Sequence, residues 1–202
     1  MKALALFLLL TSGLSAADTF EVFHYHWSVP KAADWKVVQQ DGSQILRLVT
    51  GREPPPGPRR PMQFALADTR EFRQVRVELG LRPLKRSLLI VFAYRDPEHF
   101  DYAHLSTDTA AKQPRHNGIF HVYGGERVRI SSETGPAAFA ISNRWYQVRL
   151  QFEGSSGRVQ VTVDGQHIPA LDAVDLSLSR GKVGIGSFDE TGDFRDVKIT
   201  GN

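Results

Sequence analysis

The sequence predicts an all-β fold, namely a two-sheet antiparallel jelly-roll β-sandwich of about 12–14 strands. Two observations carry this prediction. Apolar and polar residues alternate with a period of two along many short segments, and glycine-containing turns separate these segments. No stretch shows apolar residues at helical spacing over three turns. An immunoglobulin-like sandwich needs only about seven strands in roughly 100 residues, so the pattern favours a larger jelly roll.

The alternation is clearest in three segments, residues 75–81, 146–152 and 159–163, which we predict to be half-buried strands. Residues 88–94 form a continuous apolar run, as expected of a central strand that is covered on both faces. Further candidate strands follow from shorter versions of the same patterns: residues 21–27, 35–39, 45–49, 63–66, 102–107, 119–123, 128–131, 182–187 and 193–200.

Turn residues stand between these candidates. The dipeptides Asp41-Gly42, Gly124-Gly125 and Asp164-Gly165 supply the positive φ angles that tight hairpins need. Residues 170–179 could hold one helical turn. The proline-rich residues 52–61 cannot lie inside a strand or a helix and are expected to form an exposed, polyproline-like loop. That loop is either a stiff connection between two strands or a ligand for a proline-binding module.

The N-terminus has the features of a secretory signal peptide. A basic start at Lys2 precedes eight apolar residues, 3–10, and the small residues Ser15 and Ala17 suit the −3 and −1 positions of a cleavage site. The alternative is a buried N-terminal helix. Cleavage would leave a mature domain that covers residues 18–202, in a protein exported to the periplasm or the outside of the cell.

Composition excludes several classes of function. The chain has no cysteine, which rules out a disulfide scaffold, a thiolate metal site and a cysteine nucleophile. Its 25 basic and 22 acidic residues leave a net charge of only +3, and the basic residues are scattered along the chain. This distribution argues against a nucleic-acid partner. No apolar run reaches the roughly 18–20 residues that a membrane span requires.

Four sequence blocks together resemble the concanavalin A-like lectin/glucanase superfamily. They are a tryptophan followed by a hairpin at residues 34–48, an apolar strand with Tyr, Arg and Asp at 91–102, a W-Y-x-V-R-L block followed by V-D-G at 143–165, and a closing G-K-V-G-I and F-R-D-V block at 181–197. The chain is most similar to the bacterial laminin-G-like and 3-keto-disaccharide hydrolase-like members. The resemblance implies a jelly roll whose concave face or rim loops handle carbohydrate.

The resemblance does not extend to the catalytic motif of family 16 glycoside hydrolases, E-x-D-x-(x)-E, which is absent from the chain. We therefore expect an exported protein that binds an oligo- or polysaccharide and is not an enzyme of that type. Two alternatives stay open. One is a glycoside hydrolase related to the 3-keto-disaccharide hydrolases, and the other is a structural or adhesive module without a ligand.

Candidate ligand-binding residues come from aromatic, His and Asp side chains near the predicted strands 102–107 and 119–123. Tyr102 and His104 share one face of the first predicted strand, and His121 and Tyr123 share one face of the second. If the two strands are neighbours in a concave sheet, their rings would line one groove suited to stacking on sugars. The alternative is a set of satisfied side chains over the core. Three further residues, Arg95, Asp96 and Asp101, are expected at the mouth of this groove, and the alternative for Arg95 and Asp96 is a local ion pair.

Two other features carry chemistry. Trp145 begins a predicted strand and shares its face with Gln147 and Arg149, so it is a candidate sugar platform. The acidic segment 189–196 is a candidate structural Ca²⁺ site, with Asp189 and Asp193 as ligands, because Ca²⁺ prefers several carboxylate and carbonyl oxygens. The alternative is a tight turn in which these carboxylates cap the backbone and Gly192 takes a positive φ.

Overall fold

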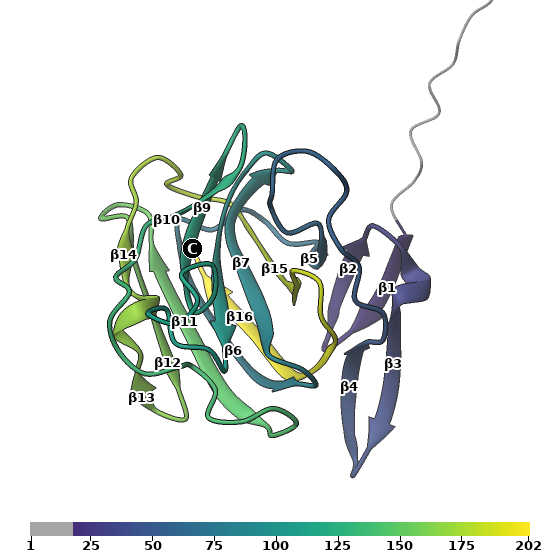
Figure 1. Ribbon diagram of the computed structural model, residues 1–202. Coiled ribbons are helices and arrows are strands. Elements are labelled where there is room, and N and C mark those ends of the chain that lie inside the picture. Colours follow the sequence, from purple (N-terminus) through teal and green to yellow (C-terminus); the bar gives the residue numbers. More distant parts are fainter. Residues whose placement is uncertain (1–17) are drawn as a thin grey trace, which may run out of the picture.

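The computed structural model describes residues 18–202 and confirms an all-β sandwich of two antiparallel sheets, which lie face to face in Figure 1. The predicted signal peptide, residues 1–17, lies outside the described residues. No helix of residues 18–202 is long and apolar enough to cross a membrane.

Sheet A contains eight strands, in the spatial order β1-β2-β5-β15-β7-β8-β9-β10. Their bounds are β1 Asp18–Val22, β2 Tyr25–Val29, β5 Gln63–Ala67, β15 Lys182–Ser187, β7 Ser87–Asp96, β8 His99–Ser106, β9 Gly118–Tyr123 and β10 Arg127–Arg129. Strands distant in sequence, such as β5, β15 and β7, are therefore hydrogen-bonded neighbours, which is characteristic of a jelly roll.

Sheet B has the order β13-β12-β11-β6-β16-β4-β3, and β14 pairs separately with β12. Their bounds are β13 Gln166–His167, β12 Arg158–Val163, β11 Tyr146–Glu153, β6 Gln74–Pro83, β16 Gly192–Gly201, β4 Ser43–Leu48, β3 Trp35–Gln40 and β14 Ala173–Val174. The two short 3₁₀ helices are η1, Ala32–Asp34, and η2, Pro169–Leu171. The helical turn expected in residues 170–179 is thus limited to η2.

One large apolar core fills the space between the sheets. It is built from the alternate residues that each strand turns inward, as the period of two predicts. The rings of Phe92 on β7 and Phe152 on β11 meet across the sandwich with their centroids 5.2 Å apart. Because no disulfide is present in the chain, this burial supplies the main stabilisation of the fold.

A second, smaller apolar cluster lies on the other, outer face of sheet A. It contains Phe100 and Tyr102 of β8, Phe120 and Val122 of β9, and Phe188 after β15. These side chains are buried although they point away from the main core. The outer face of sheet A is therefore covered, and β7 and β8 are apolar on both sides.

Two-residue hairpins form at the two predicted Asp-Gly dipeptides. Asp41 and Gly42 have φ angles of 52° and 77°, and Asp164 and Gly165 have φ angles of 50° and 77°. Two consecutive positive φ values are what a type I′ hairpin requires, and Asp-Gly tolerates them well. The first turn joins β3 to β4 and the second joins β12 to β13. The turn predicted at Gly124-Gly125 differs, because three residues, 124–126, join β9 to β10 and only Gly124 has a positive φ, of 69°.

The N-terminal segment differs from its prediction. Residues 21–27 are not one strand but parts of β1 and β2, joined by a tight turn at Phe23 and His24 with φ angles of 57° and 65°. Neither residue is a typical turn residue, so the sequence carries no glycine or proline signal there. The extra hairpin, with the short β13 and β14, raises the number of strands to sixteen, above the predicted 12–14.

Candidate functional site

Three side chains that could act chemically meet at one edge of the sandwich. The Nδ1 atom of His121 lies 2.8 Å from Oδ1 of Asp101 and 2.7 Å from Oδ2 of Asp175. Among residues 18–202 this is the only group of three His, Asp or Glu side chains whose ligand atoms all approach within 4.8 Å of one another. We call Asp101, His121 and Asp175 the rim triad.

Strand register and one loop bring the triad together. Asp101 of β8 and His121 of β9 are directly opposite each other in the antiparallel ladder, so their side chains leave the sheet on the same face. Asp175 follows β14, and its backbone N–H donates to the carbonyl of Gly157 in the turn between β11 and β12. The triad therefore links sheet A to a loop of sheet B.

Burial sets the electrostatics of the triad. Asp101 is 0% exposed, and desolvation raises the pKa of its carboxyl to about 6, although the hydrogen bond from His121 acts in the opposite direction. The hydrogen bond to Asp101 raises the pKa of His121. The second oxygen of Asp101, Oδ2, is buried and has no hydrogen-bond partner. An unpartnered buried carboxylate oxygen is costly and can accept a proton or a cation.

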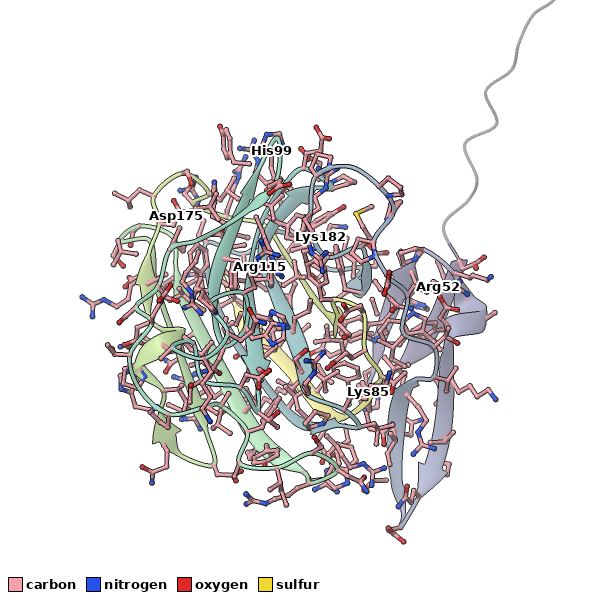
Figure 2. All side chains as sticks on the ribbon, viewed as in Figure 1. Arg52, Lys85, His99, Arg115, Asp175 and Lys182 are labelled. Atoms are coloured by element: carbon pink, nitrogen blue, oxygen red, sulfur yellow. The ribbon has the colours of Figure 1, made fainter. Side chains whose placement is uncertain are left out.

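An exposed aromatic platform adjoins the triad. The ring of Tyr123, at the end of β9, is 59% exposed and stacks on His121 at a centroid distance of 5.4 Å and an interplanar angle of 19°. The imidazole of His99 packs edge-on against the same tyrosine at 4.7 Å. Asp96 in turn orients His99, with Oδ1 of Asp96 2.9 Å from Nδ1 of His99. His99 and Asp175 lie toward the upper end of the molecule in Figure 2.

This arrangement has two chemical capacities. The carboxylate and imidazole of Asp101 and His121 are close enough to share a proton, which is the requirement for general acid–base chemistry. The three ligand atoms of the triad could also hold a metal ion. The platform of Tyr123 offers an apolar ring face, flanked by polar groups, to a ligand outside.

The predicted groove of Tyr102, His104, His121 and Tyr123 does not form. In the register, Tyr102 is opposite Phe120, and Asp101 is opposite His121. Tyr102 and His104 therefore belong to the outer face of sheet A, whereas His121 and Tyr123 share the opposite face with Asp101. The alternation within each strand correctly predicts that Tyr102 lies on the same face as His104 and that His121 lies on the same face as Tyr123. The register between β8 and β9 places these two pairs on opposite faces of the sheet.

Tyr102 and His104 are also too deeply buried to touch a ligand at the surface. Burial lowers the pKa of His104 well below its ordinary value, so the imidazole is neutral. Its Nδ1 atom lies 3.2 Å from the carbonyl oxygen of Arg115. These two residues thus belong to the layer that covers sheet A.

Arg95 and Trp145 lie in different places. Arg95 is exposed on β7 and precedes Asp96 in the chain. Trp145 precedes β11, and the guanidinium groups of Arg82 and Arg195 approach its ring centroid to 4.8 and 4.3 Å. The two arginines come from β6 and β16 of sheet B, so Trp145 belongs to a separate surface.

The expectation of Ca²⁺ at Asp189 and Asp193 needs correction. Both carboxylate oxygens of Asp193 already accept hydrogen bonds, Oδ1 from Arg47 at 2.7 Å and Oδ2 from Arg47 and Arg82. Two guanidiniums therefore neutralise the carboxylate where a cation was expected. Gly192 begins β16 without a positive φ, so the alternative of a tight turn at that glycine does not hold either.

Sequence reasoning missed Asp175 and His99. Asp175 is more than 50 residues from its partners in the chain, and only the pairing of β14 with β12 brings it to them. His99 lies three residues after Asp96, and the short spacing of these two polar residues in a turn was the one available signal.

Comparison with solved structures identifies the fold. The chain is similar to the carbohydrate-binding module CBM66 from Bacillus subtilis, with 16% identity, a TM-score of 0.59, and coverage of 86% of this chain and 94% of that one. A putative glycosyl hydrolase from Parabacteroides distasonis gives 13% identity, a TM-score of 0.56, and coverages of 85% and 92%. The GH43 protein BlXynB from Bacillus licheniformis gives 11% identity and a TM-score of 0.59, with coverages of 92% and 38%.

No protein-family model matches the sequence, and no curated protein matches it either. At such low identity the structural similarity shows the fold alone. The chain therefore has the two-sheet jelly-roll fold seen in a carbohydrate-binding module and in proteins related to glycoside hydrolases, consistent with the concanavalin A-like superfamily that its sequence blocks resemble.

Proposed function

We propose that this protein is an exported, glycan-binding β-sandwich and that it binds its oligo- or polysaccharide at the Tyr123 platform. The observation that carries the proposal is the exposed ring of Tyr123, which two imidazoles hold in place beside Asp96 and the rim triad. The fold supports it, because structures with this fold include a carbohydrate-binding module.

The geometry suits a sugar for a physical reason. A pyranose or furanose ring has an apolar face, which stacks on an aromatic ring, and equatorial hydroxyls that need hydrogen-bond partners at its edge. Tyr123 supplies the stacking face, and Asp96 and His99 supply acceptors and donors beside it. Since His99 and His121 restrain the tyrosine, little rotamer entropy is lost when a ligand binds.

Affinity electrophoresis against plant, microbial and host polysaccharides tests the proposal. We expect at least one polysaccharide to retard the wild-type protein, and Tyr123→Ala to weaken that binding by about fivefold, since an aromatic contact contributes on the order of 1 kcal/mol. Ile141→Ala is the control, because Ile141 is 60% exposed on a different loop. The proposal fails if no polysaccharide retards the protein, or if Tyr123→Ala binds as tightly as the wild type.

A glycoside hydrolase is the second candidate, and the pair of Asp101 and His121 favours it. A carboxyl whose pKa is raised to about 6 by burial, next to an imidazole, can donate and accept protons near neutral pH. Hydrolysis of disaccharides and of their 3-keto derivatives, followed by product analysis, tests this candidate. Asp101→Asn and the more exposed Asp175→Asn should each lower the rate by about 100-fold. Absence of turnover by the wild-type protein would leave binding as the function.

We also propose that the rim triad, and not Asp189 and Asp193, is the place where this protein would bind a divalent metal ion. The triad contributes an imidazole nitrogen, whereas Ca²⁺ prefers about six to eight oxygen ligands. A borderline cation such as Zn²⁺ or Mn²⁺ accepts a mixture of imidazole and carboxylate ligands. Such an ion would also neutralise the buried carboxylate of Asp101, whose Oδ2 has no hydrogen-bond partner.

Export is the part of the proposal that depends on the N-terminal sequence. The basic start, the apolar segment and the small residues Ser15 and Ala17 support cleavage after Ala17. N-terminal sequencing of the protein from a secreting host should find a mature chain that begins at Asp18. Retention of Met1 or Lys2 in the mature protein would contradict export through this route.

A further inference from the structure

A cavity on the outer face of sheet A is lined mainly by arginines. It has a volume of about 220 Å³, and its walls include the side chains of Arg59, Arg115, Arg127 and Arg129 around the ring of Phe120. The arginines come from three segments: Arg59 from the proline-rich loop, Arg115 from the loop between β8 and β9, and the other two from β10. We call this cavity the arginine cleft. Arg115 lies near the centre of Figure 2, below His99.

The positive charge of the arginine cleft is balanced only in part, since four arginines face one acidic side chain in its lining and form no direct ion pair within the described part of the chain. None of the ion pairs formed by residues 18–202 includes any of these four arginines. Glu126 is the only acidic residue in the lining. Like charges gathered in a partly enclosed space repel one another and raise the local affinity for an anion.

Arg129 shows how far this charge is withdrawn from water. Its guanidinium donates to the backbone carbonyls of Pro114, His116 and Asn117 at 3.0, 2.6 and 3.0 Å. Burial lowers the pKa of Arg129, and the nearby carboxylate of Glu133 offsets this desolvation only in part. Arg129 therefore fixes the loop that carries Arg115 and adds a partly desolvated positive charge beneath the cleft.

Arg127 is held in a position suited to binding a planar anion. Its guanidinium carbon lies 4.2 Å from the ring centroid of Phe188 and 5.2 Å from that of Phe120. Its one side-chain hydrogen bond, from Nη1, goes to the hydroxyl of Tyr102 at 3.2 Å. A stacked guanidinium keeps its remaining N–H groups in the plane of the fork, which is the geometry that receives a carboxylate with two parallel hydrogen bonds.

The wall of the cleft is stiff and continues into a larger space. Prolines at positions 54–56, 58 and 61 restrict the loop, and the backbone N–H of Arg127 donates to the carbonyl of Arg59 at 3.2 Å. A second cavity, of about 460 Å³, shares Arg59 and Glu126 with the cleft and is bounded by the proline run. The shared residues make the two cavities neighbours. If the anionic group of a sugar entered the arginine cleft, the neighbouring cavity would have room for the rest of the sugar ring.

We propose that the arginine cleft binds the carboxylate of an acidic saccharide, such as a uronic acid within a polysaccharide. The saccharide part of this inference rests on the proposed function, whereas the carboxylate part rests on the arginines alone. The cleft and the Tyr123 platform lie on opposite faces of sheet A but on one hairpin, since only residues 124–126 separate β9 from β10. One chain of sugars therefore could contact both.

Isothermal titration of the purified protein with polygalacturonate and with its carboxyl-reduced, neutral counterpart tests the inference. Arg115→Gln and Arg127→Gln are the test variants, and Arg115 is exposed enough that its substitution leaves the fold intact. Arg73→Gln is the matched control, because it removes the same charge from an exposed arginine on a different surface. We expect both test variants, and the carboxyl-reduced polymer, to bind at least about tenfold more weakly, while Arg73→Gln binds as the wild type does.

Each other outcome overturns a defined part of the inference. Equal binding of the acidic and the neutral polymer would overturn the carboxylate assignment and leave glycan binding at Tyr123 in place. Tighter binding of a sulfated polysaccharide would assign the cleft to sulfate instead. If neither polymer binds, titration with galacturonate and with galactose tests the carboxylate part, which is overturned if galacturonate binds no more tightly than galactose. The proposed function is tested separately, and it fails if no polysaccharide of the panel binds in a way that depends on Tyr123.

Discussion

At the scale of single residues, buried carboxylates have two different uses in this protein. Asp193 and Glu190 have their oxygens occupied by guanidinium, amide or hydroxyl donors, so they fasten one segment to another. Asp101 keeps one buried oxygen without a partner. Among residues 18–202, Asp101 is the one fully buried acid with an unpartnered oxygen, whereas the other such oxygen of an acid belongs to the half-buried Asp172. The open oxygen of Asp101 therefore favours a task beyond stability.

Substitution of Glu190 tests whether a buried carboxylate with hydrogen-bonded oxygens stabilises the fold. Its Oε2 accepts hydrogen bonds from the backbone N–H of Ser87 at 2.6 Å and from the Ser87 hydroxyl at 3.0 Å, and both donors are buried. Glu190→Ala leaves them unsatisfied and should lower the free energy of unfolding by about 2–4 kcal/mol, as measured by urea denaturation. Glu71→Ala, which removes an exposed ion pair with Arg180, should cost less than about 1 kcal/mol. Equal effects of the two substitutions would contradict this account.

Asp34 gives the stability a pH dependence of known sign. The hydrogen bond from Arg52 holds the pKa of Asp34 below its ordinary value of 3.8. A carboxyl whose pKa is lower in the folded state stabilises the fold above its unfolded pKa, and that contribution is lost as the pH falls through the folded pKa. The difference in unfolding free energy between the wild type and Asp34→Asn should therefore be constant above about pH 5 and shrink below about pH 4. A difference that does not change over this range would show that Arg52 does not favour the charged form.

The rim triad makes a prediction about metal ions. Titration of the metal-free protein with Zn²⁺ or Mn²⁺ should show one site per chain, and Asp175→Asn should abolish it because one of three ligands is lost. Asp172→Asn is a suitable control, since Asp172 contacts His167 at a different place. Binding that survives Asp175→Asn would place the ion elsewhere.

At the scale of secondary-structure elements, β15 depends on close approach of its neighbours. A Cβ atom added at Gly186 would lie 2.3 Å from the carbonyl oxygen of Gln63 and 2.5 Å from the Cα of Phe64, both on β5. Distances this short require the backbone of β5 to move. The glycine is thus required by the packing of adjacent strands and not by a turn.

The corresponding prediction compares two glycines. Gly186→Ala should lower the free energy of unfolding by about 1–3 kcal/mol through overpacking, whereas Gly125→Ala should change it little, because no heavy atom lies within 4 Å of its added Cβ. Thermal and urea unfolding of both variants measure this. A change at Gly125→Ala as large as that at Gly186→Ala would contradict the packing argument.

The elements also show what could be predicted from the sequence. Strands with clear alternation, such as β6, β11 and β12, and the Asp-Gly hairpins were assigned correctly because their patterns are local. The turn at Phe23 and His24 has no local signal, and the positive φ of these residues is sustained by the pairing of β1 with β2.

The candidate site was predicted only in part, because its geometry depends on register. Asp101, His121 and Tyr123 were recognised as candidates and do lie together at the rim. The pattern within one strand groups Tyr102 with His104, but it cannot establish which residues of the neighbouring strand share their face, and the register places them opposite Phe120 and Gly118. The sequence also does not show that Arg47 and Arg82, from two other strands, neutralise Asp193, at which we expected Ca²⁺.

At the scale of the whole molecule, the two faces of sheet A have different roles. The inner face builds the main core and ends in the rim triad, whereas the outer face carries a second apolar layer on which arginines stack. The hairpin of β9 and β10 joins the two surfaces. A ligand that requires both an aromatic platform and a positive cleft would therefore meet them at one end of the sandwich.

The central claim is that a glycan binds at the Tyr123 platform, and mapping amide chemical shifts during titration with a polysaccharide fragment tests it most directly. The account predicts that the largest shifts fall on Tyr123, His99 and their neighbours at the ends of β8 and β9, and that they disappear in Tyr123→Ala. Shifts confined to the surface of sheet B around Trp145 would contradict the account. A fragment that binds without shifting the amide signals of Tyr123 and His99 would contradict it too.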